Sequence, residues 1–300
     1  WEREVKMLEI KEAVSKKQDS HAVVSYHPSE NELRSAYAFV KNQPFPSIPD
    51  VVHQVNELLD QREPHLPHLI KLISEDISLV GIVLKTINSA GFGYGAIESI
   101  QHAVTLLGLD RIRSLLKASY IERFLPIGSL YAQQLVDDSK LTARAARVIA
   151  SELGVSDPDE AYIAGLMLDS GAIFLSSRFS DQYQSIFDMR FERPVTINRI
   201  EDVRIGTNHS TIGYLFARHW QLPEIVCLTI YLHHGTMCTR VQDEKLRSLL
   251  AVLKLAEHLA ARETGATMDP SMEKIQQLAG IKNELMLDQE RMTDMEQLLS

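Results

Sequence analysis

The stretch that most constrains the fold is the apolar run from Ala161 to Leu175, AYIAGLMLDSGAIFL, which carries a single carboxylate, Asp169. The length and composition of this run predict one buried helix. Burying an unpaired carboxylate is strongly unfavourable, so the fold must supply a metal, another cation, hydrogen bonds or a proton. We therefore expect a partner for Asp169 inside the core.

The composition is that of an ordinary soluble globular protein, with 45% hydrophobic and 24% charged residues in 300 residues. A chain of this size can bury a large core in one large or two small domains. The sequence contains no apolar run as long as the roughly 18 residues that a membrane span needs. Cys227 and Cys238 form no CxxC motif, which suits a reducing compartment, and we assign them no role. We expect a cytoplasmic protein.

The net charge of −9 opposes nonspecific binding to nucleic acid or to an anionic membrane. A local basic cluster follows Gly108 and consists of Arg111, Arg113, Lys117 and Arg123. Such runs are usually a solvated helix face, and a phosphate site or a nucleic-acid surface is the less favoured alternative. Neither a membrane nor a nucleic acid is an expected partner.

Helix signals recur along the chain, and strand signals are scarce. Capping residues predict helix starts at Asp76, Ser99, Asp110 and Asp157, and Gly108 ends the second of these helices. Pro223 opens a further helix, EIVCLTIYLHH. Only AVVSY and PVTI favour extended backbone, and both are short enough to be connectors. The sequence predicts an all-α protein.

Two composition shifts divide the chain. Pro44, Pro46 and Pro49 separate a peripheral N-terminal helical extension, residues 1–44, from the main domain, because closely spaced prolines keep the preceding backbone extended. At the other end, the segment from Gly265 to Pro270 introduces a Met- and Gln-rich acidic stretch. Its apolar spacing predicts that residues 261–300 form a helical C-terminal tail.

Several polar side chains are predicted to face the core. Asp138 falls within the apolar stripe of a helix over Leu130–Leu153 that contains Leu135, Leu141, Ala145 and Val148. In a helix over Leu246–Ala260, the stripe of Leu246, Leu250 and Leu253 is followed in phase by Glu257. His209 precedes an apolar helix, and His233 and His234 close the helix that Pro223 opens. Carboxylates and imidazoles that converge from several helices are what a divalent metal centre needs.

Each of these residues also has an ordinary interpretation. Asp138 can be solvated beside Asp137, and Glu257 can extend to the surface. His233 and His234 can be cations that the dipole favours at a helix C-terminus. Without a compact local signature such as HExxH, convergence of these residues is a hypothesis.

Five segments follow one another in a fixed order: FPSIPDV, ISEDISLVGIVLKTINSAGFG with its Asn88-Ser89 pair, SIQHAVTLLGLDRIRSLL, AYIAGLMLDSGAIFL and NHSTIGYLFARHWQLPEIVCLTIYLHH. Together they resemble the HDOD domain, a degenerate relative of the HD and HD-GYP metal-dependent phosphohydrolases. The resemblance implies an HDOD domain over residues 45–260, with a smaller N-terminal helical lobe (45–128) and an HD-like helical bundle (129–260). Such domains are found in bacterial signalling proteins.

The resemblance also implies a vestigial metal site. The first metal-binding histidine of HD enzymes falls at Asp138, the His-Asp pair at Leu168 and Asp169, and the last aspartate at Glu257. The added HD-GYP positions fall at His209, His233 and His234. Leu168 has no lone pair and binds no metal, while the other substitutions keep ligand chemistry.

These departures favour a non-catalytic regulatory module in signal transduction, which acts through a protein partner or a ligand and self-assembles. The chain also lacks the Gly-Tyr-Pro motif of HD-GYP enzymes. The alternative is a metal-dependent phosphohydrolase with an altered site. We expect no cofactor on the first interpretation, and one divalent ion (Fe, Mn, Mg or Ni) if Asp138, Asp169, His209, His233, His234 and Glu257 still bind metal.

Overall fold

The computed structural model describes residues 26–41, 50–61, 64–75, 77–89, 99–124, 129–179, 181–220, 222–263 and 271–299. Within these ranges all regular secondary structure is helical and no strand occurs, so the all-α prediction is confirmed. The PVTI segment is a connector as expected, but it forms a turn that leads into a helix instead of extended backbone. Most of AVVSY lies outside the described residues.

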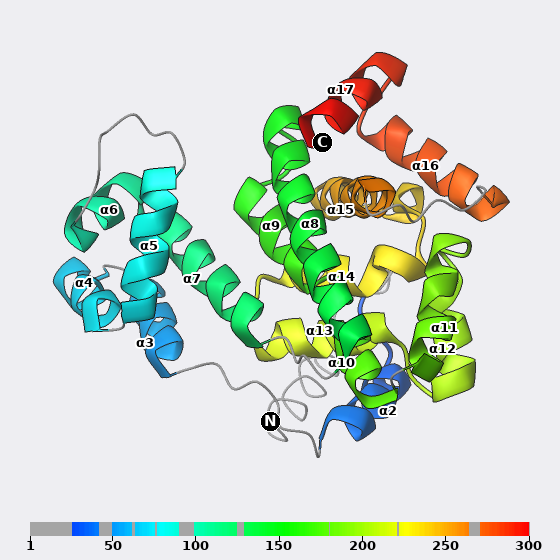
Figure 1. Cartoon of the computed structure of the whole chain (residues 1–300), viewed down its shortest axis with the longest axis horizontal. Helices are drawn as coiled ribbons and strands as arrows, with labels where there is room; N and C mark the ends of the chain where they lie inside the picture. The colour runs from blue at the N-terminus through cyan, green and yellow to red at the C-terminus, as the bar shows by residue number, and fades with distance from the viewer. Residues whose placement is uncertain are drawn as a thin grey trace, which may run out of the picture.

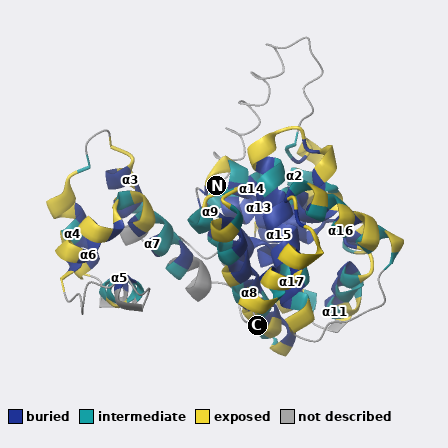
Figure 2. Ribbon diagram, turned by 90° about the horizontal axis from the view of Figure 1, so that it is seen from above, coloured by how far each residue is buried: buried dark blue, intermediate teal, exposed yellow. Residues whose placement is uncertain are grey.

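A first group of helices lies to one side of the molecule (Figures 1 and 2). It contains α3 (Asp50–Leu59), α4 (Leu66–Glu75), α5 (Ile77–Ser89), α6 (Ile100–Leu107) and α7 (Leu109–Phe124). Ser99 caps α6 by accepting a hydrogen bond from the backbone N–H of His102 (3.4 Å), and Gly108 ends the helix with a φ of 78°. Both predicted ends of α6 are thus confirmed. Helix α7 also contacts the second group through α9.

The second group is larger and holds most of the buried surface (Figure 2). Its helices are α8 (Leu130–Leu153), α9 (Pro158–Met167), α10 (Ser170–Phe179), α11 (Asp181–Phe187), α12 (Ile197–Ile205), α13 (His209–His219), α14 (Glu224–Gly235) and α15 (Glu244–Glu263), with the 3-10 helices η1 (Asp188–Phe191) and η2 (Cys238–Arg240). Helices α8, α9 and α15 pack on one another, and α13 packs between α10 and α14.

The long helix α8 has the predicted bounds, and Leu135 and Ala145 of its predicted core stripe are buried as expected. Leu141 and Val148, predicted to lie in its core stripe, are only half-buried. Ser139, Thr142 and Ile149 are buried in their place, since α8 packs against α9 on one side and α15 on the other. The buried face of α8 is therefore broader than the predicted stripe and matches it only in part.

The remaining described helices pack on the second group. Helix α2 (Glu30–Val40) begins with a capping box between Ser29 and Glu32 and packs on α13. The hydroxyl of Tyr231 on α14 donates to Glu32 Oε1 (2.9 Å). Helix α16 (Met272–Glu284) contacts α15 and η2, and α17 (Gln289–Leu299) contacts α8. The described part of the N-terminal segment thus lies directly on the second group.

Some sequence predictions concern residues outside the described ranges: Asp76 as a cap, the prolines at 44, 46 and 49, and the 265–270 connector. In the basic cluster, Arg113 forms an ion pair with Asp60 (2.9 Å) and Arg111 one with Asp159 (3.9 Å). Among the described helices, none combines the length and hydrophobicity needed to cross a bilayer.

Candidate functional site

Asp169 lies in a turn between two helices and not within one. Helix α9 begins as predicted at Pro158, with Asp157 accepting hydrogen bonds from the backbone N–H groups of Asp159 and Glu160 (2.9 and 2.8 Å). It ends at Met167, and α10 begins at Ser170. The prediction of a single helix over 161–175 is therefore wrong, because the turn at Leu168 and Asp169 interrupts it.

A close backbone contact places Asp169 beside His209. A Cβ atom added at Gly171 would lie 2.0 Å from the carbonyl oxygen of His209 and 2.9 Å from the backbone nitrogen of Gly213. Only glycine allows α10 and α13 to approach this closely. Asn208 caps α13 by accepting from the backbone N–H of Thr211 (2.9 Å), so His209 is the first residue of that helix. It was predicted just before the helix.

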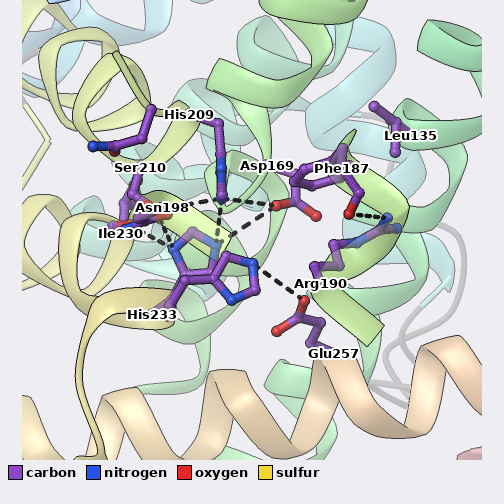
Figure 3. A network of polar contacts seen from close by, with 12 residues as sticks. Leu135, Asp169, Phe187, Arg190, Asn198, His209, Ser210, Ile230, His233 and Glu257 are labelled. Atoms are coloured by element: carbon purple, nitrogen blue, oxygen red, sulfur yellow. Dashed lines mark hydrogen bonds and ion pairs between the residues drawn. The ribbon is translucent and has the colours of Figure 1, made fainter. Parts of the chain in front are cut away.

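His233 and His234 occupy the last turn of α14, which begins after Pro223 as predicted. Both side chains are buried, and they join Asp169 and His209 in one cluster whose ligand atoms all lie within 4.8 Å of one another. Figure 3 shows the rings of His209 and His233 turned towards the Asp169 carboxylate. Asp169 Oδ1 lies 3.6 Å from Nε2 of His233 and 3.9 Å from Nε2 of His209.

In all three histidines of the cluster, the Nδ1 atom faces an oxygen acceptor. Nδ1 of His233 lies 2.6 Å from the carbonyl oxygen of Ile230, and Nδ1 of His234 lies 2.8 Å from that of Pro194. Nδ1 of His209 lies 2.6 Å from Oε2 of Glu201. Since these oxygens accept hydrogen bonds, each Nδ1 carries the donated proton, and in a neutral ring Nε2 keeps a bare lone pair. The three lone pairs point into the cluster.

This arrangement fits a metal ion. Asp169 Oδ1 and His234 Nε2 are buried without a hydrogen-bond partner among the described residues. Burial, with His233 and His209 nearby, holds the pKa of His234 well below its usual range, so this ring stays neutral. Metal-binding histidines characteristically donate their other ring N–H to a carboxylate or a backbone carbonyl, as all three do. Three imidazoles and one carboxylate suit iron or nickel better than magnesium.

The two remaining predicted ligands lie at the edge of the cluster. Glu257 on α15 is half-buried, with Oε1 at 3.8 Å from Nε2 of His234. Asp138 on α8 is half-buried, and burial raises the pKa of its carboxyl group, with a smaller contribution from Asp169. Neither residue belongs to the group of four that share the 4.8 Å limit. The structure therefore brings Asp169, His209, His233 and His234 together and leaves Asp138 and Glu257 outside this group.

Sequence reasoning did not identify three charged residues around the cluster. Arg190 in η1 is buried, with its guanidinium carbon about equally far from the Phe187 and Phe191 ring centroids (4.1 and 4.0 Å) and Nη1 at 3.3 Å from Asp188. Burial lowers the pKa of Arg190, but nearby acidic groups, Asp169 foremost, outweigh it and raise the pKa. Helix η1 has no strong sequence signal, since it is a single short turn.

The other two missed residues are Lys254 and Glu201. Lys254 on α15 is buried, and its ammonium group donates to the carbonyl oxygen of His233. Burial lowers the pKa of Lys254 to about 8. Glu201 on α12 is fully buried. The only signal that could have found Lys254 is its position among apolar residues in the stripe of α15, one turn before Glu257.

The fold and the cluster define an all-helical protein with a buried His-Asp site, and the chain's sequence matches a known family. The family model of the HDOD domain matches residues 45–236, which is more than half of the chain. The chain belongs to the HDOD domain family, as the resemblance implied. A curated relative from Treponema pallidum, an uncharacterised protein, is 25% identical in an alignment 257 residues long, which covers 76% of this chain and 50% of the relative. The chain thus spans about half the length of that relative.

Solved structures share the fold. An HDOD domain protein of unknown function from Geobacter sulfurreducens is 23% identical, with a TM-score of 0.65 over 90% of this chain and 97% of that chain. A structure from Shewanella amazonensis, named as a candidate phosphohydrolase, is 21% identical, with a TM-score of 0.63 over 92% and 94%. A structure from Marinobacter aquaeolei, named as a candidate signal transduction protein, is 20% identical, with a TM-score of 0.61 over 93% and 65%.

Proposed function

We propose that this chain is a non-catalytic signal-transduction module of the HDOD family. In this module, the cluster of Asp169, His209, His233 and His234 binds one divalent metal ion as a structural element. The observation that carries the proposal is the enclosure of the cluster. His209, His233 and His234 are at most 1% exposed, and Asp169 is 8% exposed. Side chains buried in this way leave little of their ligand atoms in contact with solvent.

Coordination chemistry supports the same conclusion. Catalytic metal sites keep a position open for water or substrate, whereas structural sites are closed by protein ligands. Four side chains within 4.8 Å of one another supply a complete ligand set for an ion that takes four ligands. An ion held in this way stabilises the junction of α10, α13 and α14, which provide or adjoin the four ligands.

Leu168 supports the absence of catalysis. It occupies the position of the lost histidine, is 1% exposed, and adds an apolar side chain beside Asp169. A hydrolase of the HD type needs the metal to acidify a bound water and to hold the phosphoryl oxygens, and the full ligand set fixes that geometry. This chain has Leu168 where the resemblance places one histidine of that set.

A regulatory role needs partners, and we extend the proposal to a signalling protein and to self-assembly. The C-terminal helices support this, since α16 exposes Met272 (69%) and Ile275 (45%), and α17 exposes Leu298 (55%). We also propose the division into residues 1–44, 45–128, 129–260 and 261–300. The net charge of −9 argues against a nucleic-acid partner.

The second candidate function is a metal-dependent phosphohydrolase with an altered site. The cluster itself favours it, because three imidazoles and a carboxylate are the kind of ligands that hydrolytic metals use. The two candidates are separated by assays with nucleotide monophosphates, cyclic dinucleotides and generic phosphate esters, each with Mn, Mg, Fe or Ni supplied. We expect no turnover above the Asp169→Ala control. Robust turnover that Asp169→Ala abolishes would overturn the non-catalytic proposal.

A further inference from the structure

Glu201 is a buried carboxylate that contacts the cluster only through His209. It is 0% exposed and lies on α12. Its Oε1 atom accepts a hydrogen bond from the hydroxyl of Tyr183 (2.6 Å). Its Oε2 atom accepts from the backbone N–H of His209 (3.0 Å) and contacts Nδ1 of the same ring (2.6 Å). A carboxylate buried this deeply is costly unless its hydrogen bonds are satisfied, and these contacts satisfy them.

The geometry determines where the proton of the His209 ring lies. Oε1 of Glu201 accepts from Tyr183 and Oε2 from the backbone N–H of His209, and a carboxylate has no proton to donate, so the ring donates to Oε2 through Nδ1. The hydroxyl of Ser210 lies 3.3 Å from Nε2 of His209, but it donates to Oδ1 of Asn198 at 3.0 Å. In the neutral ring, Nε2 therefore presents its lone pair to the cluster.

His209 differs from its two neighbours in the charge of its acceptor. Nδ1 of His233 and of His234 each face a backbone carbonyl, whereas Nδ1 of His209 faces a carboxylate. A carboxylate behind an imidazole makes the opposite nitrogen a stronger donor to a metal ion and fixes the orientation of the ring. Tyr183 holds the carboxylate from the other side, and the ring of Phe187 packs against the edge of the His209 ring at a centroid distance of 5.0 Å.

We propose that Glu201 is a positioning residue that fixes His209 in the tautomer with Nδ1 protonated, so that Nε2 is free to bind a divalent transition-metal ion. The inference rests on the proposed metal-binding role of the cluster for its effect on affinity. The tautomer itself is a property of the protein without metal and can be measured separately.

The test compares the wild-type chain with Glu201→Gln and with the matched control Asp202→Asn. Asp202 is the next residue on α12, and its carboxylate accepts from the side chain of Asn208 (2.9 Å) instead of from His209. Two quantities are measured: the ¹⁵N chemical shifts of the His209 ring in metal-free protein at alkaline pH, and the affinity for Co²⁺ from its visible absorption. We expect Glu201→Gln to weaken Co²⁺ binding about 10- to 100-fold and to shift His209 towards the Nε2-protonated tautomer. Asp202→Asn should change neither.

The proposal is overturned if metal-free wild-type protein holds His209 as the Nε2-protonated tautomer, a result that does not depend on how any variant folds. It is also overturned if Glu201→Gln folds and leaves both the tautomer and the Co²⁺ affinity unchanged. Wild-type protein that has the predicted tautomer but binds no Co²⁺ would refute the proposed metal site and support the positioning role of Glu201.

Discussion

Nε2 of His209 lies 3.3 Å from Nε2 of His233 although each ring directs its other nitrogen at an oxygen acceptor. Two neutral rings in these tautomers would face each other with bare lone pairs. That contact is unfavourable in a buried site unless a cation lies between the rings, and the cation is either a metal ion or a proton. Glu201 raises the pKa of His209 against the effect of burial, which favours such a proton when metal is absent.

We predict that protein purified without chelator contains about one divalent ion per chain, measured by elemental analysis, and that Asp169→Ala loses it. Free metal at 100 times its dissociation constant should stabilise the fold by about 2.7 kcal/mol, visible as a higher Tm than in EDTA. Affinity should fall at acidic pH, because protons compete for the imidazole nitrogens. Glu257→Gln is the control and should keep most of the metal. The prediction is contradicted if the wild-type protein is purified without metal and its Tm does not change when Fe, Mn, Ni or Mg is added.

Leu168→His would restore a histidine where the family resemblance places a lost ligand, and we predict that it creates no hydrolase. Leu168 is 1% exposed, so an imidazole there loses apolar packing and buries a polar ring. We expect a loss of about 2 to 4 kcal/mol in the free energy of unfolding, measured in urea. Leu168→Met keeps the volume and should cost less than about 1.5 kcal/mol. Phosphodiester turnover by Leu168→His would show that this single ligand is what the site lacks.

Gly171→Ala should disrupt the site through the backbone. Its Cβ would lie 2.0 Å from the carbonyl oxygen of His209, and neither backbone can yield without separating α10 from α13. We expect a loss of at least about 3 kcal/mol in the free energy of unfolding, together with loss of metal binding. The matched control is Gly81→Ala in α5, where an added Cβ has nothing within 4 Å. That change should stabilise the protein by about 0.5 to 1 kcal/mol. Equal stability of the two variants would argue against the close contact.

His258 should make the protein less stable in acid. Burial, followed by the charges of Lys274, Arg262 and Lys282, lowers the pKa of His258 from 6.5 to about 4. Between these two values the unfolded chain binds more protons at His258 than the folded chain does, so the free energy of unfolding falls as the pH drops from about 6.5 to about 4. Because the ring keeps some solvent exposure, we expect about 2 kcal/mol from this group.

Unfolding in urea at a series of pH values between these limits measures the effect. His258→Gln cannot titrate, so its stability should decline less steeply than that of the wild type over the same range. Parallel pH profiles for the two proteins would mean that His258 titrates at its ordinary pKa in the folded state.

Much of the helical structure could be predicted locally. Ser99 with Gly108 and Asp157 with Pro158 marked helix ends because caps depend on residues within one turn. The buried face of α8 could not be predicted as well, because it depends on the positions of α9 and α15. The turn at Leu168 and Asp169 was missed for a similar reason, since the apolar run around it continues unbroken through both helices.

By itself, the sequence determined that the protein is helical and that Asp169 is buried. Periodicity, caps and residue chemistry carry that information within a few turns of chain. Only the tertiary structure decided which side chains meet Asp169. His209, His233 and His234 are distant from it in the chain, and their convergence depends on the close contact of α10 with α13 at Gly171. The role of Glu201 also depends on that packing, because a carboxylate positions an imidazole only where the fold places them within hydrogen-bond distance.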